Sequence, residues 1–188
     1  SAYGVSRDST VDYFRVKAAV DELIQQSGLP YVLLRPAAFL DVWAGMILSE
    51  AQAGRPVRVF GDGRRVANYV AAEDVAEMAV RVLARHEVVN QAIDIGGPST
   101  LSQLELIEKV EAALKRSVTR KHIPLAVLRI GAVVMRPFNE LTARFMSLGA
   151  WSAAADRPLA HWSVAAAAYG VEPRTAESFL NVERFRLT

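Results

Sequence analysis

The most informative stretch of the chain is residues 12–36, which read DYFRVKAAVDELIQQSGLPYVLLRP. Its apolar residues recur at helical spacing and form one stripe, made of Val16, Val20, Leu23 and Ile24. Gly28 suits the left-handed position that ends a helix, and Pro30 prevents the helix from continuing. Residues 31–34 are an unbroken apolar run, the pattern of a parallel strand covered on both faces. The stretch therefore predicts a helix followed directly by a buried strand.

The start of this helix is marked by Ser9 and Asp12, whose spacing resembles a capping box. We therefore predict that the helix begins near Thr10. The strand that follows leads into Arg35, and open α/β sheets bind ligands at the carboxyl ends of their strands. A ligand site is accordingly expected in the segment from Arg35 to Phe39.

Tyr13 and Lys17 form a candidate chemical pair, because they stand four residues apart on one face of the predicted helix. A nearby ammonium favours the phenolate and lowers the phenol pKa from about 10. A tyrosine in that position can pass a proton to or from a carbonyl or alcohol oxygen. The alternative is a coincidental spacing, with the tyrosine ring packed on the protein and the amine in water.

The rest of the chain alternates between strand and helix patterns, as an α/β domain does. A second capping box, Ser102 with Glu105, precedes a helix whose apolar face includes Ile107 and Val110. We predict strands at 57–60, 68–71, 92–95 and 118–123, and helices at 41–53, 73–85, 125–135 and 139–148. Alanine-rich residues 165–168 are compatible with a helix, which Tyr169-Gly170 ends, and a further helix is expected to begin at 174–177.

The composition indicates a globular domain and argues against several classes of function. Of the 188 residues, 52% are hydrophobic and 22% are charged, which is typical of globular proteins. The formal net charge of +2 is too small to argue for a nucleic-acid partner. Cysteine is absent, which excludes disulfides and thiol chemistry and is compatible with the cytoplasmic location that we expect.

Membrane and metal sites are not expected either. The longest apolar stretch, residues 125–135, is far shorter than the ~20 residues of a membrane-spanning helix, and no signal peptide is visible. His86, His122 and His161 are isolated and lack the spacing of zinc ligands.

Short motifs follow one another along the chain: Tyr13-x-x-x-Lys17, Ser27-Gly28-Leu29-Pro30, Leu34-Arg35-Pro36-Ala37-x-Phe39, Val59-Phe60-Gly61-Asp62-Gly63, Asn68-Tyr69-Val70 with Glu73-Asp74-Val75-Ala76, and Ile93-Asp94-Ile95-Gly96-Gly97-Pro98. In this order they resemble the short-chain dehydrogenase/reductase superfamily. The closest similarity is to its atypical branch of NmrA-like and NAD-dependent epimerase-like proteins. The likeness covers residues 1–125 well and the remainder loosely.

The resemblance implies a fold and a cofactor. It implies the C-terminal part of a doubly wound, Rossmann-like parallel sheet with a small, mostly helical substrate lobe. It also implies that NAD or NADP is bound. The chain lacks the glycine-rich fingerprint, because Gly61-Asp62-Gly63 supplies only G-x-G. We therefore expect residues 1–188 to be a single α/β domain from a longer NAD(P)-binding protein, with the pyrophosphate site upstream of Ser1.

The resemblance further implies roles for individual residues. Tyr13 matches the catalytic tyrosine, and Lys17 matches the lysine that tunes it and binds the nicotinamide ribose. Ser1 lies near the place of the family's catalytic serine. The cofactor is expected to contact Lys17, Arg35, Pro36, Ala37 and Phe39, and a substrate pocket is expected to include Trp43, Asn68 and Tyr69. For Trp43 a packing role is the alternative, and for Arg35 a structural salt bridge.

We therefore predict an NAD(P)-dependent oxidoreductase or epimerase-type enzyme that acts on a small molecule, with a homodimer as a possible assembly. The alternative is a non-catalytic NAD(P)-sensing or scaffolding NmrA-like protein that uses the apolar residues 125–148 as a partner surface. A third reading is an interaction module without a cofactor.

Overall fold

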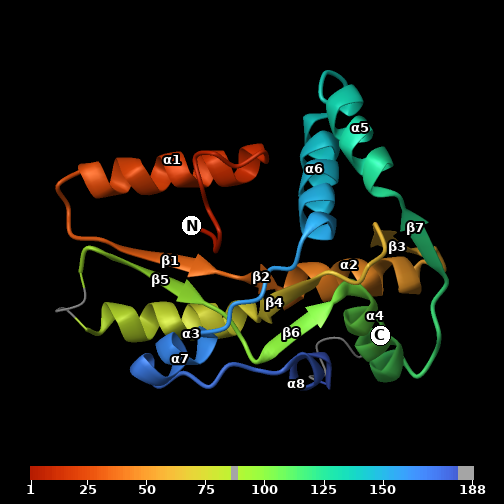
Figure 1. The fold of residues 1–188 in the computed structure, drawn as a ribbon. Coiled ribbons are helices and arrows are strands. Elements are labelled where there is room, and N and C mark those ends of the chain that lie inside the picture. Colours follow the sequence, from red (N-terminus) through yellow and green to blue (C-terminus); the bar gives the residue numbers. More distant parts are fainter. Residues whose placement is uncertain (86–88, 182–188) are drawn as a thin grey trace.

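The computed structural model describes residues 1–85 and 89–181 (Figure 1). Helices and strands follow in the order α1 (Asp12–Gln26), β1 (Val32–Pro36), β2 (Ala38–Phe39), α2 (Leu40–Gln52), β3 (Val57–Phe60), β4 (Val66–Val70), α3 (Ala72–Leu83), β5 (Gln91–Ile95), β6 (Ser99–Ser102), α4 (Gln103–Leu114), β7 (Arg120–Ile123), α5 (Leu125–Met135), α6 (Glu140–Ala154), α7 (Trp162–Tyr169) and α8 (Ala176–Asn181). The predicted alternation of strands and helices is confirmed.

The strands form three small sheets, and most of their pairs are parallel. β1 pairs with β5 and β3 pairs with β7, both in parallel. β4 lies between β2, which is parallel to it, and β6, which is antiparallel. Parallel pairs require crossover connections through helices, which is why helices separate these strands in the sequence. The predicted α/β class, with Rossmann-like parallel pairing, is confirmed.

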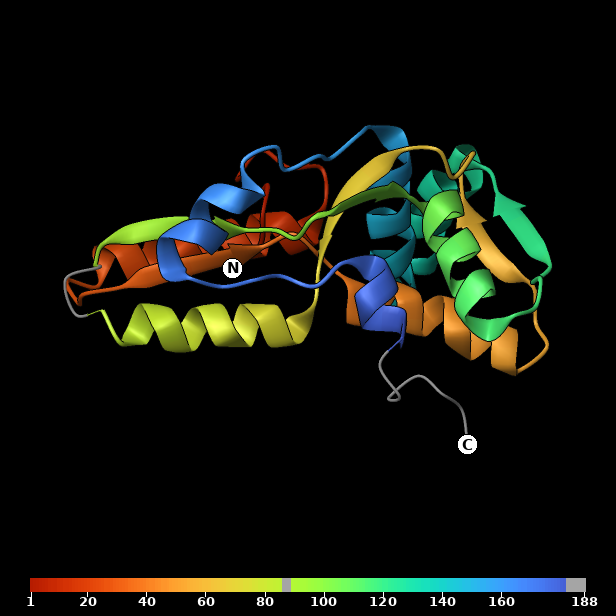
Figure 2. The ribbon, with the colours of Figure 1, turned by 90° about the horizontal axis from the view of Figure 1, so that it is seen from below.

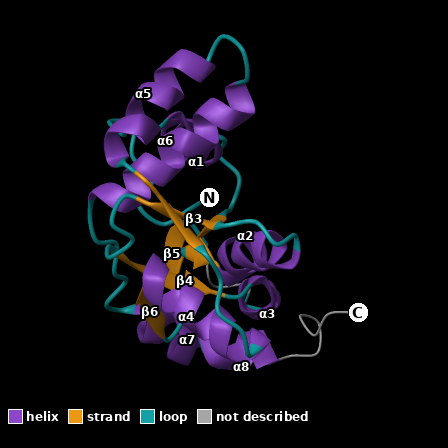
Figure 3. Cartoon of the chain, turned by 90° about the vertical axis from the view of Figure 1, so that its right-hand side faces the viewer, coloured by secondary structure: helices purple, strands orange, loops and turns teal. Residues whose placement is uncertain are grey.

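Helices cover both faces of the β1–β5 pair. Figure 1 shows α1 above the two strands and α3 with α7 below them, and Figure 2 shows the same arrangement from below. Figure 3 shows the strands between an upper group with α1, α5 and α6 and a lower group with α3, α4, α7 and α8. The main core cluster lies between α2, β3 and α4 and includes Leu40, Ile47, Val59, Leu106 and Ile107.

The predicted capping box at the start of α1 is wrong. The helix begins at Asp12, with Val11 at the N-cap and no side-chain cap. The Ser9 hydroxyl accepts a hydrogen bond from the Val11 N–H at 3.2 Å, in a local turn that competes with capping. The box at Ser102 and Glu105 is confirmed, with both reciprocal hydrogen bonds present at the start of α4.

The apolar stripe predicted on α1 faces outward. Its members Val16 and Leu23 are 59% and 67% exposed. The helix instead buries Phe14, Ala18 and Asp21. β1, which follows, pairs only with β5 among the described strands. This side of the molecule therefore presents an apolar helix face beside a strand edge without a partner strand.

Helices α5 and α6 form a hairpin that projects from the body (Figure 1). Leu128 is buried at its base in a cluster with Phe60 and Ala150. At its tip Val133 and Phe138 are 74% and 80% exposed. Within the described residues, no helix is long and apolar enough to cross a membrane.

Candidate functional site

A cavity of about 240 Å³ lies where α1, the β1–β2 junction, α2, β4 and α6 meet. Its walls are mainly apolar, and the residues that line it are Ser1, Ala2, Tyr3, Tyr13, Phe14, Pro36, Ala37, Ala38, Phe39, Val42, Trp43, Ala67, Asn68, Leu148, Trp151, Ser152 and Arg157. Six of the predicted site residues are among them. Lys17, Arg35 and Tyr69 are not.

Tyr13 and Lys17 lie together, as their spacing predicts. The Lys17 ammonium nitrogen lies 5.7 Å from the centre of the Tyr13 ring. Neither the Tyr13 hydroxyl nor the Lys17 ammonium forms a hydrogen bond or ion pair with a described residue. Both groups are therefore open to a ligand.

The electrostatic effect on Tyr13 differs from the expected one. Partial burial raises the pKa of the Tyr13 phenol above its ordinary value, whereas the spacing alone suggested a lowered pKa. The cause of the rise is desolvation of the phenol by burial. The phenol is therefore protonated at neutral pH, which is the form that can donate a proton.

The β1–β2 junction forms an apolar wall of the cavity through Pro36, Ala37 and Phe39. Backbone hydrogen bonds fix this wall, because the Pro36 carbonyl accepts from the Tyr3 N–H at 2.9 Å and the Ala37 N–H donates to Ile95 at 2.8 Å. Arg35 turns away to pair with the buried Asp21. Arg35 therefore forms a structural salt bridge, which was the alternative to a cofactor contact in the sequence analysis.

The three residues predicted to bind substrate have different surroundings. Trp43 lines the cavity and also packs edge-on against Phe60 and Tyr69. Asn68 borders the cavity, but its amide is engaged with Gly97 and Thr100. Tyr69 is 3% exposed and belongs to the core cluster. Their roles in substrate binding stay predictions.

Ser1 and Arg157 complete the site. The Ser1 hydroxyl donates to the Asp21 carboxylate at 2.8 Å, so it belongs to the ion pair with Arg35. Arg157 comes from the segment after α6 and was missed in the sequence, where a single arginine between Asp156 and Pro158 carries no functional signal. Only the structure brings it to the cavity.

Two free donors in and near the cavity suit one end of a nicotinamide dinucleotide. The Tyr13 hydroxyl belongs to a residue that lines the cavity, and the Lys17 ammonium lies by the Tyr13 ring outside the lining. Such donors and an apolar wall are the chemistry that a ribose hydroxyl pair and a flat nicotinamide ring require. Among the described residues no glycine-rich turn leads from a strand into a helix to hold the pyrophosphate. The site fits the nicotinamide end of the cofactor.

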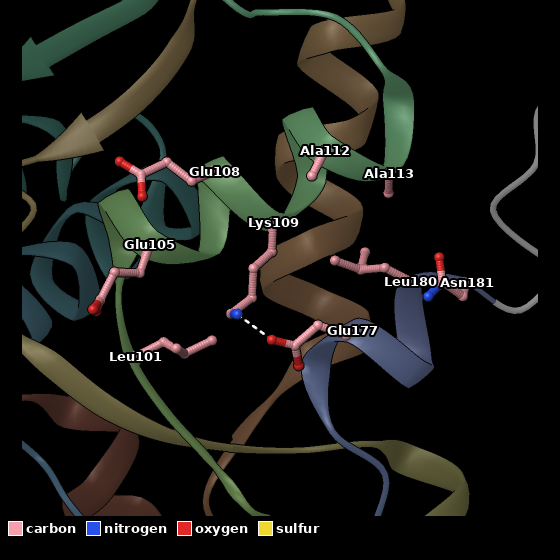
Figure 4. A pocket seen from close by; sticks show the side chains of 9 residues that line it. All are labelled: Leu101, Glu105, Glu108, Lys109, Ala112, Ala113, Glu177, Leu180 and Asn181. Carbon is pink, nitrogen blue, oxygen red and sulfur yellow. Dashed lines mark hydrogen bonds and ion pairs between the residues drawn. The ribbon is translucent and has the colours of Figure 1, made fainter.

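A larger cavity of about 550 Å³ lies between α4 and α8. In Figure 4 the Lys109 side chain reaches Glu177, with which it forms an ion pair. Glu105 is engaged in the capping box of α4, and Glu108 pairs with Arg120 at 3.9 Å. The carboxylates around this cavity are therefore committed to structural contacts, which makes it a weaker candidate than the smaller cavity.

No cluster of three or more potential metal ligands occurs within residues 1–85 and 89–181. His122 contacts the Gly61 carbonyl at 3.0 Å. His86 lies outside the described residues.

Comparison with known proteins extends these observations. No family model matches the chain. It is 30% identical over 119 residues to an NAD(P)H azoreductase from Xenophilus azovorans, covering 61% of this chain and 40% of the relative. It is 27% identical over 138 residues to the dTDP-glucose 4,6-dehydratase of Xanthomonas campestris, covering 68% of this chain and 39% of the relative.

A solved structure shows the same fold. The UDP-glucuronic acid 4-epimerase from Bacillus cereus, in complex with UDP-glucuronic acid and NAD, superposes with a TM-score of 0.68 at 16% identity. The match covers 100% of this chain and 60% of the epimerase. The predicted resemblance to reductase and epimerase-type proteins of the short-chain dehydrogenase/reductase superfamily is therefore confirmed. The chain spans about 40% of the length of these two curated relatives.

Proposed function

We propose that this chain carries the proton-transfer site and the nicotinamide side of an NAD(P)-dependent oxidoreductase or epimerase-type enzyme. The observation that carries the proposal is a cavity with an apolar wall that is lined by Tyr13, whose hydroxyl is unengaged and whose ring centre lies 5.7 Å from the Lys17 ammonium. The names of the relatives, an NAD(P)H azoreductase and a dTDP-glucose dehydratase, support it. A non-catalytic sensor or scaffold is not favoured by these relatives.

The chemistry assigned to the chain is the movement of one proton. A bound nicotinamide supplies hydride transfer. Tyr13 is protonated at neutral pH and donates its proton to the substrate oxygen during reduction, and the Lys17 ammonium stabilises the phenolate that remains. In the reverse direction the phenolate accepts the proton of the substrate alcohol.

We assign the cofactor contacts to Lys17 and to Pro36, Ala37 and Phe39, with NAD versus NADP left open. Arg35 is a cofactor ligand only if it leaves Asp21, so we propose that it acts by holding β1 in place. Trp43 supplies an apolar wall for the substrate, while Asn68 and Tyr69 shape the site from behind.

The exposed apolar stripe on α1 and the unpaired edge of β1 are surfaces that further secondary structure could cover. We propose that a further strand and helix of a longer NAD(P)-binding protein cover them and bring the pyrophosphate site. A homodimer, a cytoplasmic location and the absence of a nucleic-acid partner are part of the same proposal. Hydrogen exchange of the β1 amides tests the first point, because a covering strand slows their exchange.

The test of the proposed function is Tyr13→Phe in the complete protein. We expect kcat to fall about 10² to 10⁴-fold for oxidation of NADPH or NADH with quinones and aldehydes, or for interconversion of nucleotide sugars. KM should change little, because the ring and its packing are kept. Tyr31→Phe, which removes a hydroxyl outside the cavity, is the matched control. Full activity of Tyr13→Phe would overturn the proposed role.

A further inference from the structure

Arg157 is the charged side chain of the cavity. Its guanidinium carbon lies 3.8 Å from the centre of the Trp151 ring, which is a stacking contact. Two backbone hydrogen bonds fix its position on β4: the Arg157 N–H donates to Val66 at 2.6 Å, and the Arg157 carbonyl accepts from the Asn68 N–H at 3.1 Å. The cation is therefore presented on a rigid part of the fold.

This guanidinium lacks the partner that other partly buried arginines have. Arg35 and Arg174 each pair with a carboxylate that is less than 5% exposed. The buried Nε of Arg157 has no hydrogen-bond partner, and Arg157 forms no ion pair with any described residue. A buried donor of a cation without a partner is unfavourable, and an anionic ligand would supply the partner that Nε lacks.

The nearest carboxylates are not available to neutralise it. Asp156 accepts a hydrogen bond from the Val66 N–H at 3.0 Å and lies 3.9 Å from Arg65. Asp8 and Asp156 border a neighbouring hollow that Arg157 also lines, and neither forms an ion pair with it. Burial also lowers the pKa of Arg157 from its ordinary value.

The other side chains that line the cavity indicate which chemical groups a ligand would carry besides the anionic group that meets Arg157. All of them are apolar or uncharged, and they include the rings of Tyr13, Phe39, Trp43 and Trp151. The volume of about 240 Å³ is below the ~300–1,000 Å³ usual for sites of drug-sized ligands. The cavity thus suits a small, mostly apolar molecule with one anionic group.

We propose that Arg157 binds the anionic group of the substrate, a carboxylate or a phosphate ester, and that the substrate is a small apolar or aromatic carbonyl or alcohol compound. This inference rests on the proposed function for the reacting end of that molecule, since Tyr13 lines the same cavity. The guanidinium accepts either anion through paired N–H groups, while Trp151 keeps its plane fixed.

The test compares matched probes without cofactor. Titration calorimetry measures the affinity of the protein for 4-phenylbutanoate, for phenyl phosphate and for neutral 4-phenylbutanamide. We expect one of the two anions to bind about 10 to 100-fold more tightly than the amide, as a charge-assisted hydrogen bond allows. The tighter anion identifies whether a carboxylate or a phosphate is preferred. Equal binding of the amide and both anions would overturn the proposal.

Substitution assigns the effect to the residue. Arg157→Gln should abolish the preference for the anion, and Arg157→Lys should restore part of it. Arg85→Gln is the matched control, because Arg85 also stacks on a ring, that of Tyr169 at 4.8 Å, outside the cavity. A preference that survives in a folded Arg157→Gln protein would exclude the assignment.

The experiments can reject the catalytic role of Tyr13 and the anion site at Arg157 independently of each other. Loss of anion preference in Arg157→Gln with full turnover in Tyr13→Phe would keep the anion site and reject the catalytic role. A large loss of turnover in Tyr13→Phe with equal binding of the anions and the amide would do the opposite.

Discussion

Arg35 donates two hydrogen bonds to a single oxygen of Asp21, from Nε at 3.2 Å and from Nη2 at 3.0 Å. The Ser1 hydroxyl donates to the same oxygen. Asp21 is 4% exposed, so the network is a buried link between α1 and β1. It holds the helix that carries Tyr13 and Lys17 against the strand that leads into the cavity wall.

Asp21→Ala is expected to lower the free energy of unfolding by about 3 kcal/mol, because it leaves the Arg35 cation partly buried without its partner. Urea unfolding measures the change. Glu22→Ala is the control: it removes the partner of Arg7 in an exposed pair at 3.0 Å and should cost about 1 kcal/mol or less. Equal losses for the two variants would contradict the structural role of the buried pair.

Asn68→Ala is expected to destabilise the protein by about 3 kcal/mol, because it leaves both polar groups of the Gly97 backbone without their partner. Hydrogen exchange should show faster exchange of the Gly97 N–H. Thr100→Val removes a single side-chain contact of Asn68 and should cost about 1 kcal/mol. The prediction fails if exchange at Gly97 is unchanged in Asn68→Ala.

The stability of the protein should fall as pH rises above about 10, the ordinary pKa of tyrosine. Burial raises the pKa of Tyr69 well above its ordinary value. In that range the unfolded chain loses the Tyr69 proton while the folded chain keeps it, so alkaline pH favours unfolding. Urea midpoints between pH 9 and 11 should decline less in Tyr69→Phe than in the wild type. If the urea midpoint of Tyr69→Phe declines with pH as steeply as that of the wild type, the buried Tyr69 phenol is not the cause of the decline.

We expect the packing at the base of the α5–α6 hairpin, and not the side chains at its tip, to contribute to the stability of the protein. Leu128→Ala, at a position 1% exposed, is expected to cost about 2–5 kcal/mol through the cavity it leaves. Val133→Ser and Phe138→Ser, at the exposed tip, should stay within about 0.5 kcal/mol of the wild type. Thermal unfolding with calorimetry separates the two groups. A tip variant as unstable as Leu128→Ala would mean that the tip is packed in solution.

Local signals in the sequence predicted most of the elements. The boundaries of β3 and α5 agree with the structure, because each segment is mainly apolar and has clear flanking residues, with Pro56 and Gly61 around β3 and Pro124 and Arg136 around α5. Two short strands, β2 and β6, were missed. They contain two and four residues and exist because β4 lies between them as their common partner. No local pattern encodes such pairing.

The same limit applies to the site. Tyr13 and Lys17 could be paired from the sequence because a helix fixes the distance between positions four apart. Whether the stripe with Val16 and Leu23 faces a core could not be known, since that depends on which elements pack against the helix. Arg157 depends on a contact with β4, a strand 90 residues earlier, and a sequence read segment by segment contains nothing to reveal it.

The β-bridge between Arg157 and β4 also determines at what stage of chain synthesis the cavity can form. Next to it, the Tyr3 hydroxyl donates a hydrogen bond to the Pro158 carbonyl, which joins residues 155 positions apart. During synthesis the tyrosine–lysine pair is therefore complete long before the pocket around it is closed. A chain that stops before residue 157 would retain Tyr13 and Lys17 but would lack the residue that closes the cavity beside Tyr13. The folded C-terminal segment therefore decides whether the N-terminal residues line a cavity at all.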